Sequence, residues 1–220
     1  MARVKNGVNG APSGKVGAVV FCKWKGINYV RSLPKVKKRR KLSDSEVKNR
    51  SKFGFAQNFL SPYKKFFRLG FHHYGENMTA FNAAMSYHLE HAVKVDENGP
   101  FMDYGKFAIS RGLEEAITAA TVEIVDEKLH IRWQLKNRDE LFQRELTDFK
   151  VIFLLLPETS MFYADSIFLG NNIIDLEETV VLPKVNSPCT FHLYLGFVAT
   201  DGSNRSMNSV YLGHINVDKE

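Results

Sequence analysis

Residues 121–135 read TVEIVDEKLHIRWQL, and the spacing of their apolar residues indicates the class of fold. Apolar and polar residues alternate on both sides of Asp126 and Glu127, which is the period of β-strands that have one face in a core. The alternation gives inward positions to Val122, Ile124, Leu129, Ile131, Trp133 and Leu135. We therefore predict two antiparallel strands, 121–125 and 128–135, joined by a tight turn.

Similar segments follow along the C-terminal half of the chain. Runs of β-prone residues lie at 107–110, 150–157, 165–170, 178–183, 190–199 and 209–217. Turn residues separate these runs, and residues 96–105 are a turn-rich connection. Because short strands with this spacing are typical of a β-sandwich, we predict an antiparallel β-sandwich over residues 101–220.

This half also resembles a known kind of domain. A tryptophan lies in the second predicted strand, and the run FHLYLGFVATDGSNRS is followed by a closing strand, VYLGHINV. Together these features resemble a fibronectin type III or immunoglobulin-like domain over residues 117–217. The resemblance implies a module that serves adhesion or packing.

Helices are predicted upstream of the sandwich, over residues 43–100. Ser43 and Glu46 fit a Ser-x-x-Glu capping box for a helix over 44–60. Ser61 and Pro62 begin a second helical piece that Gly70 ends. Apolar side chains at helical spacing predict a further helix over 77–93.

Residues 1–42 are predicted to form a glycine-rich arm. In WKGIN a glycine lies between two β-prone runs, so we predict an antiparallel hairpin of strands 16–25 and 27–33. The motif SGKVG is not a phosphate loop, because Asn9 and Val16 replace the glycine and the hydroxyl residue that a Walker A loop needs. The whole chain is therefore predicted to be an α+β protein with a hairpin arm, a helical segment and an Ig-like or fibronectin III-like β-sandwich.

Charge is divided unevenly along the chain. Residues 1–70 hold 18 Lys and Arg against two acids, a net charge of +16, whereas residues 71–220 hold 12 against 22, a net charge of −10. The densest basic run consists of Lys35, Lys37, Lys38, Arg39, Arg40 and Lys41. Such asymmetry indicates a polyanion site or association between copies, with the basic part of one on the acidic part of the next.

The N-terminal motifs also resemble a protein family. The series SGKVG, WKG, VRSLP, the basic run, KNRSKFGFAQNFL, RLGF and MTAFNAAMSY spans most of the first 90 residues. It resembles a family of uncharacterised proteins from Bacteroidota, a domain of unknown function. The resemblance implies no activity.

Other classes of function find little support in the sequence. The first residues do not resemble a secretory signal and no apolar run is long enough to span a bilayer, so we expect a cytoplasmic or virion protein. His88 and His91 have a spacing that zinc tolerates but lack a third ligand, so we expect surface or boundary histidines and no metal. Because no nucleophile elbow is present, we expect no enzyme and no cofactor.

Two hypotheses on function remain. The first is a non-enzymatic assembly protein, such as a phage tail or connector protein or a filament subunit, which self-associates or docks on other subunits. Strands of the arm would add to a sheet edge of the partner. The residues expected to contact the partner are Phe21, Trp24, Tyr29 and Arg31.

The alternative is an accessory protein that binds nucleic acid. The basic run 35–41 and Arg50 would lie on phosphates, and Trp24 would stack on bases. Affinity would then fall steeply with salt, whereas assembly through strand pairing would depend little on salt.

Overall fold

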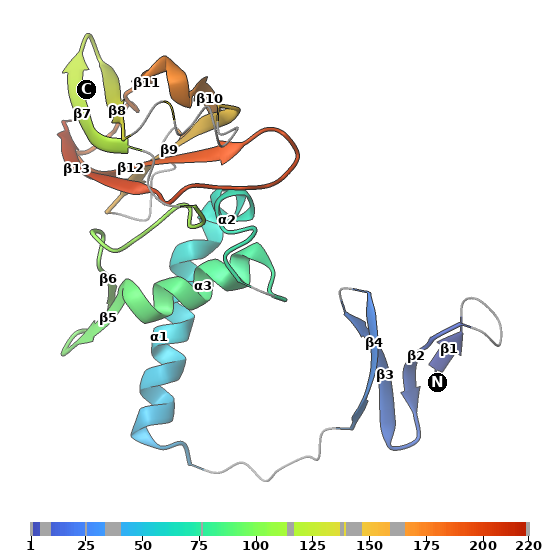
Figure 1. The fold of residues 1–220 in the computed structure, drawn as a ribbon. Coiled ribbons are helices and arrows are strands. Elements are labelled where there is room, and N and C mark those ends of the chain that lie inside the picture. The colour runs from blue at the N-terminus through green and yellow to red at the C-terminus, as the bar shows by residue number, and fades with distance from the viewer. Residues whose placement is uncertain are drawn as a thin grey trace. The chain divides into compact units, whose positions relative to one another are not determined.

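The computed structural model describes residues 2–4, 10–24, 26–33, 41–75, 77–113, 117–136, 139, 147–158 and 166–218 (Figure 1). The chain divides into two compact units, Met1–Ser43 and Asp44–Glu220. Of the predicted basic run, Lys41 is described and exposed. Lys35, Lys37, Lys38, Arg39 and Arg40 lie outside the described residues.

The first unit is a sheet of antiparallel strands in the order β1-β2-β3-β4. Its strands are β1 (Ala2–Val4), β2 (Pro12–Val16), β3 (Val19–Trp24) and β4 (Ile27–Ser32). The predicted hairpin is confirmed as β3 and β4, with Gly26 at a φ of +85° in its turn. The predicted first strand is shorter than expected, because Gly17 at a φ of +54° turns the chain back into β2.

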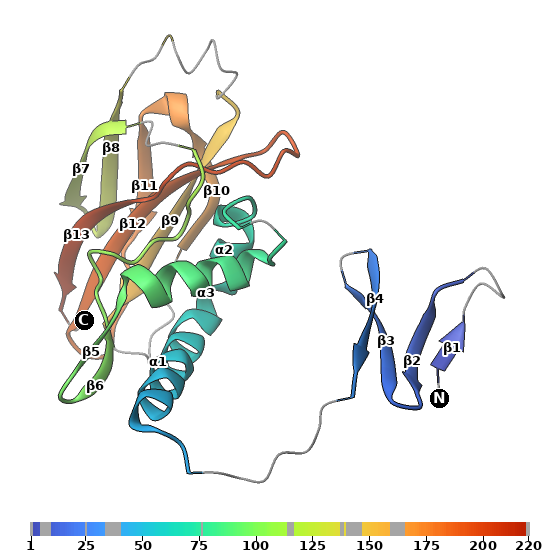
Figure 2. The ribbon, with the colours of Figure 1, turned by 60° about the horizontal axis from the view of Figure 1, so that its bottom comes forward.

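The second unit contains the predicted β-sandwich (Figure 2). Its strands are β7 (Ile117–Val125), β8 (Lys128–Leu135), β9 (Phe149–Pro157), β10 (Ser166–Asn172), β11 (Glu177–Val181), β12 (Cys189–Ala199) and β13 (Val210–Val217). One sheet has the order β11-β8-β7 and the other the order β10-β9-β12-β13. The third and fourth strands of the sandwich, β9 and β10, pair with each other. The same pairing occurs in immunoglobulin-type sandwiches in which a further strand extends the sheet of strands G, F and C.

The predicted turn at Asp126 and Glu127 is also present. Both residues have positive φ, +49° and +60°, which fits the type I′ turn of a two-residue hairpin. The inward positions are correct for Leu129, Ile131 and Trp133, which are buried. The prediction is wrong for Ile124, which is 51% exposed because the tip of the hairpin lies outside the core of the sandwich.

Helices precede the sandwich, as predicted. They are α1 (Asp44–Leu60), the 3-10 turn η2 (Ser61–Tyr63), α2 (Lys64–Gly70) and α3 (Ala80–His91). The last begins three residues later than predicted, because the Thr79 side chain accepts a hydrogen bond from the backbone N–H of Asn82 and caps the helix there.

Two segments between the helices and the sandwich differ from the prediction. A short hairpin, β5 (Val93–Asp96) and β6 (Gly99–Met102), runs from the end of the predicted helix into the turn-rich connection 96–105. Residues 107–110 are buried but form no strand. Instead, the backbone N–H groups of Ile109 and Ser110 donate to the Ser209 hydroxyl at 3.0 and 3.3 Å.

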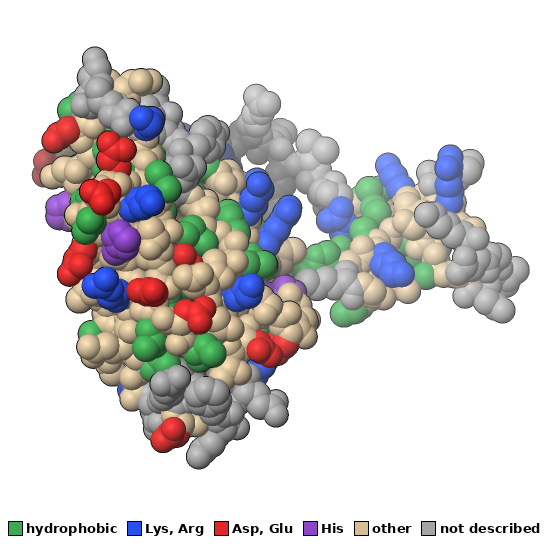
Figure 3. All heavy atoms as spheres, turned by 90° about the horizontal axis from the view of Figure 1, so that it is seen from above, with side chains coloured by type: hydrophobic (Ala, Val, Ile, Leu, Met, Phe, Trp, Pro, Cys, Tyr) green, Lys and Arg blue, Asp and Glu red, His purple; other side chains and the backbone are tan. Residues whose placement is uncertain are grey.

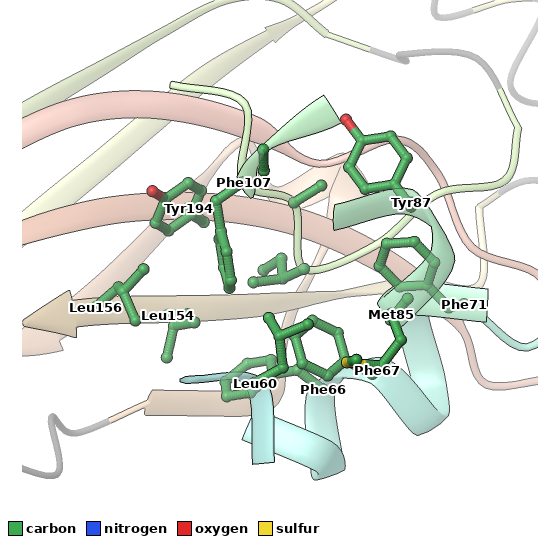
Figure 4. Packing of buried hydrophobic residues seen from close by; sticks show 14 of the residues in the cluster. Leu60, Phe66, Phe67, Phe71, Met85, Tyr87, Phe107, Leu154, Leu156 and Tyr194 are labelled. Atoms are coloured by element: carbon green, nitrogen blue, oxygen red, sulfur yellow. The ribbon is translucent and has the colours of Figure 1, made fainter. Parts of the chain in front are cut away.

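The central strands of the four-stranded sheet, β9 and β12, are buried on both faces. Alternate residues of β9 and β12 point into the core between the two sheets, among them Phe153, Leu155 and Leu193. The residues between them pack against the helices, as Leu154, Leu156 and Tyr194 do beside Phe67 and Phe107 (Figure 4). A strand covered on both faces carries a continuous apolar run, which explains VIFLLLP at 151–157. The helical segment and the sandwich thus share a core.

His88 departs from the expectation of a surface or boundary histidine. It is fully buried on α3, at 0% exposed, with the rings of Phe67 and Phe107 5.4 and 4.8 Å away. Its Nδ1–H donates to the carbonyl of Ala84 at 2.7 Å, and its Nε2 accepts from the N–H of Ala108 at 3.3 Å. Because both ring nitrogens have backbone partners, the ring can be buried without leaving a polar atom unpaired.

Candidate functional site

The N-terminal sheet has no core of its own. None of the described side chains of residues 2–43 is buried. The large apolar side chains that stand exposed on it are Val4, Val16, Trp24, Ile27, Tyr29 and Val30. A small sheet is stable in water when one of its faces is covered, so this one needs a further layer.

The strand register divides the predicted contact residues between two faces. Phe21 lies opposite Val30, and Tyr29 lies opposite Cys22. Because successive side chains of a strand point to opposite faces, Trp24, Tyr29 and Arg31 share one face and Phe21 lies on the other. The structure therefore brings three of the four predicted residues together.

One side of the sheet combines aromatic and basic residues, and we call it the aromatic–basic face. It carries Trp24 and Ile27 beside the β3–β4 turn and Tyr29 on the next row. Arg31, Val20 and Lys15 form a row across three strands, and Arg3 lies on β1 opposite Ser13. All three of these cationic residues are exposed.

The opposite side is mostly apolar, and we call it the apolar face. Its residues on the four strands are Ala2, Val4, Pro12, Gly14, Val16, Val19, Phe21, Lys23, Asn28, Val30 and Ser32. Lys23 is the charged residue among them. The edge strand β4 is exposed along its whole length, with no further strand beside it among the described residues. Such an edge can accept another strand.

Charge on this unit is of one sign. Residues 1–43 contain 12 Lys and Arg and no Asp or Glu. Figure 3 accordingly shows basic side chains and no acidic ones on its described part, at the right of the view. Arg50, the remaining predicted contact, is exposed on α1 and belongs to the second unit, whereas Lys41 belongs to the first.

The second unit contains a cavity of about 480 Å³ that sequence reasoning missed. The cavity lies between α1, η2, β6 and the end of β9. The residues that line it are Phe55, Asn58, Phe59, Pro62, Tyr63, Pro100, Phe101, Met102, Tyr104, Pro157 and Glu158. Aromatic rings and prolines thus make up most of the described wall, which also contains the Asn58 amide and the Glu158 carboxylate.

A group of titratable side chains adjoins this cavity. The His192 ring stacks on Tyr104 with centroids 3.9 Å apart and planes inclined by 10°. Its Nε2 lies 3.1 Å from Oε1 of Glu158, and its Nδ1 lies 2.7 Å from the Tyr211 hydroxyl. Since an ionised carboxylate only accepts, Nε2–H donates to Glu158 and Nδ1 accepts from Tyr211.

Burial sets the protonation of this group. Burial lowers the pKa of His192, against the opposing effect of its hydrogen bond to Glu158, and so favours the neutral ring. Burial together with the nearby Glu158 charge raises the pKa of Tyr104 and of Tyr211, so both phenols stay neutral. Among the described residues that line the cavity, Glu158 is the one that carries a carboxylate.

The described part of the chain holds neither a membrane-spanning helix nor a cluster of metal ligands. None of its helices is long and apolar enough to cross a membrane. Within the same residues, no group of three or more His, Cys, Asp and Glu is placed to hold a metal ion.

The architecture is thus an antiparallel β-sandwich with helices on the outer face of its larger sheet, preceded by a separate basic sheet. The model of a family described as "Family of unknown function (DUF6266)" matches residues 10–213, so the chain belongs to this family. The match confirms the predicted membership of an uncharacterised family, and it extends well beyond the first 90 residues. A comparison with curated proteins found no match.

Proposed function

We propose that this protein is a non-enzymatic assembly protein whose N-terminal sheet docks on a second copy of the chain. The observation that carries the proposal is the lack of any buried side chain among the described residues of 2–43, despite an ordered sheet of four strands. Apolar side chains such as Val30 and Val16 lose their contact with water when another surface covers the sheet.

Charge supports a second copy as the partner. Residues 1–43 carry a net charge of +12, from 12 Lys and Arg and no acids, whereas residues 44–220 hold 18 Lys and Arg against 24 acids, a net charge of −6. The basic sheet of one copy is therefore attracted to the larger unit of another. Charge would orient the two copies, and apolar contact would hold them together.

The exposed edge of β4 supports strand addition as the mode of docking. A strand that pairs along β4 would satisfy backbone groups with hydrogen bonds, while the apolar face packs on the partner surface. Each copy would then both give and receive a sheet, which builds a closed ring or an open filament. A phage tail or connector protein, or a filament subunit, uses such head-to-tail contacts.

The experiment is a comparison of oligomeric state between two matched variants of the full chain. Val30→Asp places a charge on the apolar face, whereas Val125→Asp places the same charge on the hairpin tip of the sandwich, and the two valines are 54% and 49% exposed. Sedimentation velocity should give an oligomer for wild type and Val125→Asp and a monomer for Val30→Asp. An unchanged oligomer in Val30→Asp would refute the proposed interface.

The aromatic–basic face favours a second candidate function, binding of single-stranded nucleic acid. Trp24 and Tyr29 offer rings to bases, beside the cations of Arg31 and Lys15 on the same face. Stacking on one ring contributes about 1–3 kcal/mol per base, so Tyr29→Ala should weaken binding of an oligonucleotide at least about fivefold. Equal affinity of wild type and Tyr29→Ala by fluorescence anisotropy would remove this candidate.

A further inference from the structure

We propose that the cavity between α1, β6 and the end of β9 binds a small organic cation, an ammonium or guanidinium group carried on an apolar body. This site lies within the second unit and is independent of the docking sheet. Its ligand chemistry follows from the aromatic wall, the carboxylate and the size of the cavity.

The wall supplies ring faces to a cation. Phe59 lies at the centre of a ring cluster, with its centroid 5.8 Å from that of Phe55, 6.4 Å from Tyr63 and 6.3 Å from Tyr104. Phe101 adds a further ring that is partly exposed. Aromatic faces attract cations through the ring quadrupole, and they also cover the apolar body of such a ligand.

Glu158 supplies the charge. Its side chain lines the cavity and is 48% exposed, so it can reach a ligand as well as His192. Among the described residues, His192 is the basic side chain within ion-pair distance of Glu158. Burial favours the neutral form of the His192 ring, which then forms a hydrogen bond with Glu158 but does not neutralise its charge. Among the described residues that line the cavity there is no Lys or Arg. A cationic ligand would therefore meet a carboxylate whose charge is not already cancelled.

The carboxylate is also held in place. The backbone N–H of Glu158 donates to the carbonyl of Thr190 at 3.0 Å, which continues the β9–β12 ladder past its end. His192 fixes the side chain from one side, and its ring is clamped by Tyr104 and Tyr211. A preorganised carboxylate loses little conformational entropy when the ligand binds.

The volume favours a small molecule over a folded partner. A cavity of about 480 Å³ lies within the usual range for small-molecule sites, about 300–1,000 Å³, and its wall has the usual composition of apolar groups with a few polar ones. The expected ligand therefore has an apolar body of about one ring with a single cationic group.

The test uses the full chain and two probes of nearly equal shape, 2-phenylethylammonium and the neutral 2-phenylethanol. Binding is followed by NMR of methyl-labelled methionine, because Met102 lines the cavity. We expect the Met102 signal to shift with both probes and the cation to bind at least about tenfold more tightly. Equal affinity of the two probes, or no shift with the cation, would overturn the proposal.

Two variants and a peptide sharpen the test. Glu158→Gln should abolish the preference for the cation, whereas Glu90→Gln, at an exposed carboxylate of α3, should keep it. Phe101→Leu, at an exposed part of the wall, should reduce affinity for the cation more than for the alcohol. Binding of a peptide with the sequence of residues 33–43, without binding of the small cation, would overturn the small-molecule assignment and make the basic segment the occupant.

Discussion

Acid should destabilise the second unit through His88, and the size of the effect follows from its surroundings. Burial lowers the pKa of His88 from 6.5 to about 4, against the opposing hydrogen bonds with Ala84 and Ala108. A proton on Nε2 would displace the N–H of Ala108, which this nitrogen accepts at 3.3 Å. The folded protein therefore resists protonation of a ring that the unfolded chain protonates readily.

The sign and magnitude follow from linkage. Between pH 6.5 and 4 the unfolded chain binds a proton at His88 and the folded chain does not, so the free energy of unfolding decreases as the pH falls. The slope reaches about 1.4 kcal/mol per pH unit, and the loss totals about 3 kcal/mol once the pH is below the folded pKa. Above pH 7 this contribution to stability is fully present.

The assay is urea unfolding followed by circular dichroism from pH 7.5 to 4, for wild type and His88→Phe. Phenylalanine keeps a ring in the aromatic cluster but cannot titrate, although it leaves the N–H of Ala108 unpaired, which costs about 1–3 kcal/mol at neutral pH. The free energy of unfolding of wild type, relative to that of the variant, should fall by about 3 kcal/mol across this range, so that at pH 4 the variant is at least as stable as wild type. A difference that stays constant with pH would refute the reasoning.

Four further substitutions test how the second unit is held together, each read by the midpoint of urea unfolding. Gly70→Ala should lower stability by about 2 kcal/mol or more, because a new Cβ would press on the Ile109 carbonyl and on the Ser110 side chain. In α1, a Cβ at Gly54 meets nothing within 4 Å, so Gly54→Ala should raise stability slightly. Ser209→Ala should cost about 1–3 kcal/mol, because two buried N–H groups at Ile109 and Ser110 lose their acceptor; an unchanged midpoint would mean that water replaces the hydroxyl. Trp133→Phe should cost about 1 kcal/mol or more, because the indole N–H donates to the buried carbonyl of Ile173 at 2.8 Å; a variant as stable as wild type would show that this bond contributes nothing.

Local patterns were sufficient for much of the fold. Alternation in 121–135 gave β7, β8 and their turn, and capping signals together with Gly70 gave the first two helices. The same reasoning took residues 107–110 for a strand, because apolar side chains of a buried irregular segment imitate alternation. Their backbone partners lie on Ser209, about a hundred residues away, where no local pattern can show them.

The candidate sites were predictable to different degrees. Trp24, Tyr29 and Arg31 lie on one face of the sheet, and alternation within VFCKW could have placed Phe21 on the other face, since it lies three residues before Trp24. The cavity could not be found in this way, because its carboxylate, histidine and tyrosines come from segments that meet only in the folded chain. The polar His192 within the apolar run of β12 was the one local signal.

Whether the N-terminal sheet joins copies of the chain can be decided from the absolute molar mass of the nuclease-treated protein. Light scattering at low and at high salt measures it, with the ratio of absorbance at 260 and 280 nm recorded before the nuclease step. We expect a defined oligomer or a filament free of nucleic acid that persists in high salt, because salt screens apolar contact and strand pairing little. A monomer of 25.1 kDa at both salt concentrations would contradict it.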